Sequence, residues 1–260
     1  MSDVLITEVD GPVATLTMNR PRERNAISDE MRQELDAALD DVTADPEIRV
    51  VILAGNGKSF CAGGDVRAMQ ERMQAPAGQR AIEGWRRQQR TGGLAQSLHN
   101  VGAITVAAVN GHAVGLGFDL ALACDFIVAA PDATFAASFI NRGLVSDGGG
   151  MYHLPRRVGL QKAKEILFSG RFVDVEEARA IGIVDLIAKE GDLMAEARAY
   201  AGQFTGQSRA AIMLMKSIVN RTFELSLESV AALGSEAQAI CYTTDEHRES
   251  VEAFLAPRQR

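Results

Sequence analysis

The sequence predicts an α/β fold that ends in an all-helical region. Short apolar, β-branched runs alternate with segments of helical periodicity, which is the pattern of strands connected by helices. From about residue 190 the strand signals stop, while helical ones continue. A chain of 260 residues with 47% apolar content is long enough to bury one sizeable core. We therefore expect an α/β core followed by helices.

The first part of the chain predicts a hairpin, a helix and a buried strand, in that order. Two strand-like runs, 4–9 and 13–18, are joined by Asp10-Gly11, a strong hairpin signal. Ser28 then caps a helix whose apolar residues recur at helical spacing, and an Asp-Pro pair ends it. The apolar run 50–53 follows as the next strand. This order is a β-β-α unit.

The middle of the chain repeats this alternation. Apolar runs at 104–109, 126–129 and 133–136 predict three more strands. Residues 73–78 contain Pro and Gly and predict a mobile loop, and the arginine-rich stretch after it, to residue 95, predicts a polar helix. A run of charges of this kind is usually a solvated face.

The last sixty residues predict helices only, over 190–204, 207–224 and 226–255, with a break near residue 244. Their apolar positions are too numerous for one solvated face, so these helices must pack against something. One alternative is a flap folded onto the chain's own core. The other is a contact between subunits.

Two glycine-rich segments, 59–65 and 110–119, carry the strongest functional signal. Each follows a strand and opens a helix, a geometry that leaves backbone N–H groups free. Either turn alone would be ordinary connectivity. Together they can aim two amides at one oxygen, the arrangement that stabilises an enolate or a tetrahedral oxyanion. Neither segment has a P-loop lysine or a dinucleotide fingerprint, so a standard nucleotide site is not expected.

Composition excludes several other classes of function. The net charge of −7 argues against a nucleic acid or an anionic membrane as the main partner. Three scattered cysteines and four histidines show no ligand spacing, so no metal and no disulfide framework are expected. The N-terminus has no leader pattern, and no apolar stretch approaches the roughly 20 residues of a membrane helix. We expect a soluble, cytoplasmic protein.

Three motifs occur together and in order. They are N-R-P-x-x-x-N-A at 19–26, F-x-A-G-x-D at 60–65 and N-G-x-A-x-G at 110–115. On these motifs, and on further matches along nearly the whole chain, the sequence resembles the crotonase (enoyl-CoA hydratase/isomerase) superfamily. The resemblance implies a spiral of ββα units over 1–195 and a helical region over 196–260 that builds a trimer, often stacked into a hexamer.

The resemblance also implies the substrate and its contacts. The substrate is an acyl-CoA thioester, and no separate cofactor is expected because coenzyme A is part of the substrate. The family's two oxyanion amides fall on Gly64 and Leu116. The coenzyme A contacts fall on the residues around Gly64, with help from 254–260. The full set implied for coenzyme A is Arg22, Arg24, Ala62, Gly64 and Asp65.

Other positions in these motifs have less direct roles. Asp65 is better explained as the cap of the helix that follows it than as a substrate contact. Leu116 replaces the glycine of many relatives, yet its backbone amide survives that change. The family region at 73–95 covers the acyl pocket, which makes Trp85 a candidate lining residue.

The proton-handling groups depart from those of an ordinary enoyl-CoA hydratase, which uses two glutamates. The matching positions here are Asp119 and Phe139, and phenylalanine cannot transfer a proton. Another acid, Asp147, lies in a glycine-rich turn. Relatives with an acid there include dienoyl-CoA isomerases, ring-epoxide phenylacetyl-CoA isomerases and 4-chlorobenzoyl-CoA dehalogenases. The alternative role for Asp147 is a helix cap before Gly148.

Chemistry separates these options. A double-bond shift can be run by one base that removes a proton and returns it, and the enolate between these steps is held by the two amides. We therefore expect an enoyl-CoA isomerase with Asp147 as the proton shuttle, Asp119 as supporting acid and Phe139 in the pocket wall. A hydratase is the alternative, and a catalytically reduced CoA-ester-binding paralogue is a further one. Thr91-Gly92 occupies the place of the dehalogenase's histidine and tryptophan, which disfavours that reading.

Overall fold

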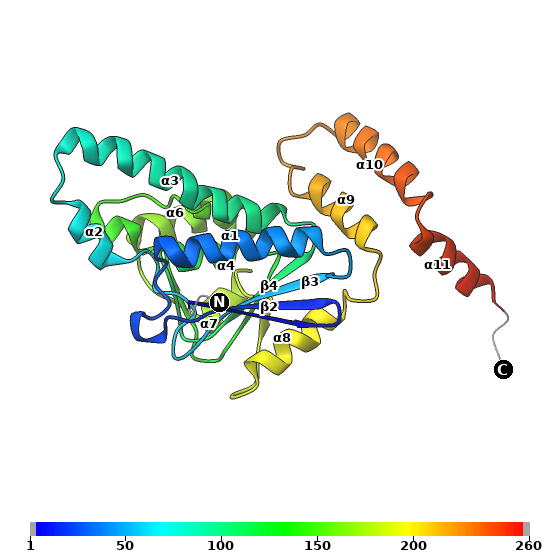
Figure 1. Ribbon diagram of the computed structural model, residues 1–260, viewed down its shortest axis with the longest axis horizontal. Helices are drawn as coiled ribbons and strands as arrows, with labels where there is room; N and C mark the ends of the chain where they lie inside the picture. Colours follow the sequence, from blue (N-terminus) through cyan, green and yellow to red (C-terminus); the bar gives the residue numbers. More distant parts are fainter. Residues whose placement is uncertain (1–3, 257–260) are drawn as a thin grey trace.

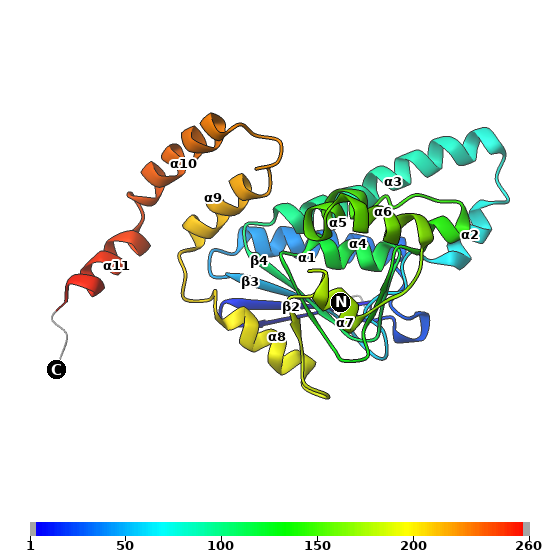
Figure 2. The ribbon, with the colours of Figure 1, turned by 180° about the vertical axis from the view of Figure 1, so that it is seen from behind.

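A computed structural model of the chain describes residues 4–256. It has an α/β body, with α10 and α11 projecting away from it in both views (Figures 1 and 2). No helix in the described part of the chain is both long and apolar enough to cross a membrane.

A six-stranded sheet forms the centre of the body, in the order β1-β2-β3-β4-β6-β9. The first two strands are an antiparallel hairpin and the remaining pairs are parallel. Because parallel strands end at the same edge, the turns after β3 and β4 leave the sheet side by side. The strands are β1 (Leu5–Asp10), β2 (Val13–Met18), β3 (Val50–Gly55), β4 (Ile104–Val109), β6 (Phe126–Ala129) and β9 (Leu186–Ile187).

A small second sheet collects the segments that follow this edge, in the order β5-β7-β8. Its strands are β5 (His112–Val114), β7 (Thr134–Ala136) and β8 (Val173–Asp174). The strand predicted over 133–136 is thus confirmed, but it pairs outside the main sheet.

Helices lie on both faces of the large sheet. The helix predicted after Ser28 is confirmed as α1, and the Ser28 side chain accepts a hydrogen bond from the Met31 amide. On the opposite face, α8 covers β3, β4 and β6 with a smaller apolar cluster. The helices of the body are α1 (Asp29–Ala44), α2 (Val66–Arg72), α3 (Ala77–Asn100), α4 (Leu116–Ala123), α5 (Gly150–Val158), α6 (Leu160–Ser169), α7 (Val175–Ala180) and α8 (Leu193–Gly202), with 3₁₀ turns η1 (Pro21–Glu23) and η2 (Ser138–Arg142).

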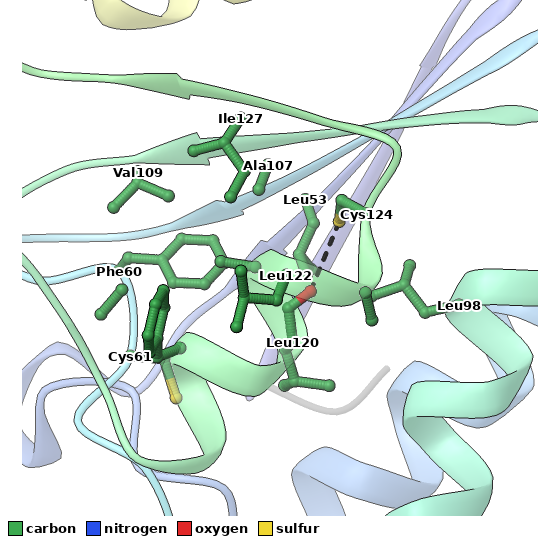
Figure 3. Close-up of a cluster of buried hydrophobic side chains, with 14 of the residues drawn as sticks. Leu53, Phe60, Cys61, Leu98, Ala107, Val109, Leu120, Leu122, Cys124 and Ile127 are labelled. Carbon is green, nitrogen blue, oxygen red and sulfur yellow. Dashed lines mark hydrogen bonds between the residues drawn. The ribbon is translucent and has the colours of Figure 1, made fainter. Parts of the chain in front are cut away.

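Helix α4 occupies the centre of the main core, and all eight of its residues are buried. Figure 3 shows Leu120 and Leu122 of this helix among side chains from the sheet and from α3. Apart from Asp119 its side chains are apolar, and a helix enclosed on every side has little freedom to move. Its N-terminus, at Leu116, is therefore held rigidly.

The C-terminal helices differ in how they meet the body. Helix α9 (Arg209–Val219) is tied to it by Lys216, whose Nζ lies 2.7 Å from an Asp125 carboxylate oxygen. Helices α10 (Leu227–Cys241) and α11 (Asp245–Leu255) have no buried residue. Near the start of α11, Glu246 forms an ion pair with Arg49 of the body at 3.3 Å, but no side chain of α10 or α11 is buried on the core. The flap alternative is therefore wrong for the apolar faces of these two helices, whereas α9 does pack on the chain's own body. The domain division at 195/196 stays a prediction, and that boundary falls inside α8, which packs on the sheet.

Candidate active site

A cavity of about 410 Å³ opens where the first turns of α1, α2 and α4 approach α3. Five residues singled out by the sequence line it: Gly64, Asp65, Leu116, Phe139 and Asp147. They come from four separate segments of the chain. The fold therefore gathers these predicted residues around one hollow.

The two glycine turns are hydrogen-bonded to each other. The Cys61 amide donates to the His112 carbonyl at 3.0 Å, and the Val114 amide donates to the Cys61 carbonyl at 2.9 Å. A Cβ on Gly117 would lie 2.3 Å from that same Cys61 oxygen, so a larger residue does not fit there. At Gly63 the backbone has φ 97°, and a Cβ would approach Leu116 N to 3.4 Å. Close backbone approach thus explains these two glycines.

The amides of Gly64 and Leu116 donate to no acceptor among the described residues. Beside Gly64, the Ile27 backbone bonds to the Gly63 carbonyl and the Asp65 amide, which leaves the Gly64 N–H unused. Leu116 is the first residue of α4, where an amide has no intrahelical acceptor. Both residues line the cavity. Two free donors at one hollow are what an oxyanion site requires.

Asp147 is half-buried and lines the same cavity. Burial raises the pKa of its carboxyl group, while a hydrogen bond from its own backbone and the nearby Arg87 guanidinium oppose that rise. Helix α5 begins only at Gly150, with Gly149 as its N-cap. The alternative role of Asp147 as a helix cap is therefore wrong.

Asp119 is fully buried and does not line the cavity. Its carboxylate accepts hydrogen bonds from the Ser146 hydroxyl and from the Gly148 amide, each at 2.9 Å. Burial raises the pKa of Asp119 to about 7, against the effect of these bonds. The prediction that Asp119 acts as a supporting acid is corrected here, because its side chain points beneath the segment that carries Asp147. It contacts both neighbours of Asp147 in the sequence.

Two further predictions concern the cavity wall. Phe139 lines it, in the position where the family's second glutamate was expected. Trp85 does not, and it is 65% exposed. The cavity-facing residues of α3 include Arg87, and a helix turns by 100° per residue, so a residue two positions earlier points about 200° away. The prediction that Trp85 lines the cavity is wrong for this chain.

The residues expected to contact coenzyme A lie around the first glycine turn. Asp65 caps α2 through the Arg67 and Ala68 amides and is bound by Arg20, so its role as a helix cap is confirmed. Arg22 and Arg24 are exposed on the loop before α1, outside the cavity lining. The Arg24 carbonyl accepts a hydrogen bond from the Ala62 amide at 2.9 Å. Of the expected C-terminal contacts, residues 257–260 lie outside the described residues.

Three arginines at the cavity were missed as site residues: Arg32, Arg72 and Arg87. The arginine-rich run before residue 95 was taken as a solvated face, yet Arg87 faces inward. The signal available in the sequence was helical spacing. Arg87 lies four residues before Thr91 and seven before Leu94, and residues at these spacings share one helix face, which in this structure faces inward. In the described residues no group of three or more His, Cys, Asp or Glu side chains could hold a metal ion.

Comparison with known proteins decides the family. The sequence model of the enoyl-CoA hydratase/isomerase family matches residues 8–260. The chain belongs to this family. It is 31% identical over 256 residues to a short-chain-enoyl-CoA hydratase of Clostridium acetobutylicum, an alignment that covers 98% of the chain and 95% of the relative. The match identifies the chain as an enzyme of the hydratase/isomerase type.

Solved structures of this family have the same fold. An enoyl-CoA hydratase of Bacillus anthracis superposes with a TM-score of 0.89 at 26% identity, covering 96% of this chain and 95% of that one. An enoyl-CoA hydratase of Polaromonas sp. JS666 superposes with a TM-score of 0.88 at 31% identity, covering 98% and 99%. The predicted crotonase-like α/β fold with a helical C-terminal region is therefore confirmed.

Proposed function

We propose that this member of the hydratase/isomerase family shifts the double bond of an enoyl-CoA, with Asp147 as the proton carrier. One observation supports this above the others. Of the two aspartates considered for proton transfer, only Asp147 lines the cavity that also contains the free amides of Gly64 and Leu116. The second catalytic glutamate of a hydratase is replaced by Phe139, which has no proton to exchange.

The proposed reaction needs one base and one anion site. The Asp147 carboxylate takes a proton from the carbon next to the double bond, and the electrons move to the thioester oxygen as an enolate. Two N–H donors, from Gly64 and Leu116, stabilise that oxyanion, and each such donor typically contributes about 2.7 to 4 kcal/mol. The protonated Asp147 then gives the proton to C4, the far carbon of the original C3–C4 double bond, as the enolate collapses and leaves the double bond between C2 and C3. Because burial raises its pKa, Asp147 is a stronger base than an exposed aspartate.

Asp119 serves this reaction indirectly in our proposal. It holds the segment on both sides of Asp147 through Ser146 and Gly148, so it fixes where the Asp147 carboxylate lies. A buried side chain with these bonds cannot reach a substrate in the cavity. We therefore assign it as a positioning residue.

Water addition to a 2-enoyl-CoA is the alternative, and the names of the relatives favour it, since several are called hydratases. Hydration requires a base for water and an acid for carbon. Asp147 would have to perform both tasks, because neither Phe139 nor the sealed Asp119 is available. A catalytically reduced CoA-ester-binding protein is the remaining alternative, and it predicts no turnover.

A direct assay separates the three. Purified protein is incubated with matched 2-enoyl-, 3-enoyl- and 2,4-dienoyl-CoA thioesters, and the products are analysed by mass spectrometry. Isomerisation leaves the mass unchanged in H₂O. In D₂O it introduces deuterium at C4, the carbon that receives the proton. Hydration adds the mass of one water. A product with added water and no isomerised product would overturn the proposal, and no reaction with any thioester would favour the binding protein.

Coenzyme A itself is proposed to bind beside the first glycine turn, against Ala62 and the cationic loop of Arg22 and Arg24. The hydrogen bond between Ala62 and Arg24 supports this placement, since it holds the loop next to the turn. Replacing both arginines with glutamine is expected to weaken binding of free coenzyme A about tenfold. Unchanged binding would remove these side chains from the site.

We also propose that the C-terminal helices join subunits into a trimer or a hexamer. Leu227 and Phe254 are 80% and 82% exposed in the single chain, and other apolar side chains accompany them on α10 and α11. Sedimentation of the wild-type protein should show three or six chains per particle. Leu227→Glu with Phe254→Glu should lower that number, and a wild-type monomer at micromolar concentration would refute the proposal.

A further inference from the structure

One side of the cavity contains a cluster of arginines that the proposed reaction does not use. Arg72 of α2 and Arg87 of α3 line it, as does Arg32 of α1. Arg32 is bound to Asp36, with Nη1 and Oδ2 3.0 Å apart. No residue in the described part of the chain forms a hydrogen bond or an ion pair with the side chain of Arg72 or Arg87.

The guanidinium groups of Arg72 and Arg87 lie in an electrostatically unfavourable environment. The Nε atoms of Arg72 and Arg87 are buried and have no hydrogen-bond acceptor within residues 4–256. The pKa of Arg87 is lowered first by burial and then by the positive charge of Arg72, so the two guanidinium groups repel each other. Asp29 and Asp147 attract Arg87 from a distance, but neither is bonded to it. An anion between the two arginines would reduce this repulsion and could accept hydrogen bonds from their Nη groups, which have no acceptor among the described residues.

The position of the cluster identifies the part of the substrate it meets. Gly64 and Leu116, the proposed site of the thioester oxygen, border two hollows. A small one, of about 70 Å³, also contains Ala62, the residue expected beside coenzyme A. The main cavity contains Asp147, Arg72 and Arg87 instead, so it lies on the acyl side of the carbonyl group.

There is room for a chain on that side. A further hollow of about 200 Å³ continues between α2 and α3 and shares Met69, Arg72, Arg87 and Gln88 with the main cavity. An acyl chain that leaves Asp147 would pass along Met69 and Leu144, which are apolar, before it meets the guanidinium groups. The charged end of this hollow has three arginines, Arg72, Arg80 and Arg87, against one acid, Glu83, so it is net cationic. An apolar path with a net cationic end suits a chain that is apolar along its length and anionic at its tip.

We propose that the enzyme acts on enoyl thioesters whose acyl chain ends in a carboxylate, and that Arg72 and Arg87 bind that carboxylate. The inference rests on the proposed function, because it takes the carbonyl group to lie at Gly64 and Leu116. Guanidinium groups pair with carboxylates through two parallel hydrogen bonds, which gives both strength and orientation.

The test compares two saturated thioesters of equal chain length, hexanoyl-CoA and adipoyl-CoA, which differ in a terminal methyl or carboxylate. Dissociation constants are measured by isothermal titration calorimetry on the full-length protein. Adipoyl-CoA is expected to bind about tenfold more tightly than hexanoyl-CoA. Arg72→Gln and Arg87→Gln should each remove that preference, while hexanoyl-CoA binds within about twofold of its wild-type value.

A matched control is Arg67→Gln, on the same helix as Arg72 but exposed and outside the cavity lining, which should retain the preference. Equal binding of the two thioesters by the wild type would overturn the proposal. So would an equal loss for both ligands in Arg72→Gln and Arg87→Gln, which would show that the arginines bind a coenzyme A phosphate.

The two sources of anion are also separated with N-acetylcysteamine thioesters, which have no phosphate and should show the same preference for the carboxylate. Saturated thioesters cannot be isomerised, so the binding result does not depend on the reaction. A protein that prefers adipoyl-CoA but converts no enoyl-CoA would contradict the proposed function, and it would support only the assignment of Arg72 and Arg87 as the binding site of a terminal carboxylate.

Discussion

The two sides of the segment 146–150 contain the same chemical group in opposite environments. On the cavity side, Asp147 is half-buried and has no bond to another side chain. On the inner side, Asp119 is sealed from solvent and bonded to Ser146 and Gly148. Burial and partners, rather than residue type, decide which aspartate is available to exchange a proton with a substrate. The inner one determines where the outer one lies.

The largest effect is expected from Asp147→Asn. Asparagine keeps the shape of the side chain but cannot accept a proton, so kcat for isomerisation of a 3-enoyl-CoA should fall by about 10³, within the range of general base catalysis. Binding of hexanoyl-CoA should stay within about threefold, because the fold and the cavity are retained. The comparison breaks if Asp147→Asn is active while Asp119→Asn is inactive, since the inner aspartate would then be the base.

Gly150→Ala tests how tightly the inner side is packed. A Cβ there would lie 2.2 Å from Asp119 Oδ1 and 2.5 Å from Ser146 Oγ, so these side chains must move. The free energy of unfolding should fall by about 2 to 3 kcal/mol, measured by urea denaturation. Gly93→Ala on α3, where a Cβ meets nothing within 4 Å, is the matched control and should stabilise the protein by about 0.5 to 1 kcal/mol. Equal effects of the two substitutions would show that the layer beneath Asp147 is loosely packed.

The pH dependence of the free energy of unfolding reports on the buried carboxyl group of Asp119. The pKa of Asp119 is about 7 in the folded chain and about 3.9 when unfolded, so the folded state binds more protons between these values. The resulting stabilisation is fully present below about pH 4 and is lost as the pH rises through 7. Between pH 5 and pH 8 the wild type should therefore lose about 2 to 3 kcal/mol more of its free energy of unfolding than Asp119→Asn does. Parallel curves for the two proteins would mean that Asp119 is ionised at all these pH values.

The smallest effect is that of Asp119→Asn on activity. An amide oxygen in the place of Oδ2 can still accept hydrogen bonds from Ser146 and Gly148, but the NH₂ group in the place of Oδ1 cannot accept from the Ser146 hydroxyl, which lies 3.0 Å from Oδ1, so Asp147 is held less firmly. We expect kcat to fall about three- to tenfold with KM little changed, as steady-state assays would show. Asp119→Glu keeps the charge but adds a methylene to a packed site, and it should not restore the rate. If kcat of Asp119→Asn fell as far as kcat of Asp147→Asn, Asp119 would have to take part in proton transfer itself and could not be only a positioning residue.

Much of the fold could be predicted because local signals and the final packing agree. Ser28, the Asp10-Gly11 turn and the apolar run of β3 each specify one element, and each element formed there. The pairing of β7 with β5 and β8 could not be read from the sequence, because a short apolar strand looks the same in either sheet. The direction in which α10 and α11 leave the body could not be predicted either, because an apolar helix face shows that something covers it but not what.

The part of the candidate site that consists of backbone amides could be predicted from the sequence. Gly64 and Leu116 follow from the two glycine turns, whose close approach only glycine permits. The roles of Asp119 and Asp147 depend instead on which side of one segment faces the cavity, and sequence spacing does not resolve that. Arg87 and Trp85 were misjudged for a related reason, since a charged run and an aromatic residue on one helix were each assigned to the wrong face.

The position of the exposed apolar helices at the end of the chain has a consequence for synthesis. The strands of the large sheet all lie before residue 188, and α8 completes the covering of that sheet by residue 202. At about 5 to 20 residues per second, the remaining residues take roughly 3 to 12 s to translate. The body can therefore fold on the ribosome before the exposed apolar helices have been made. The order of the elements along the chain delays exposure of Leu227 and Phe254 until the rest of the described chain is already folded.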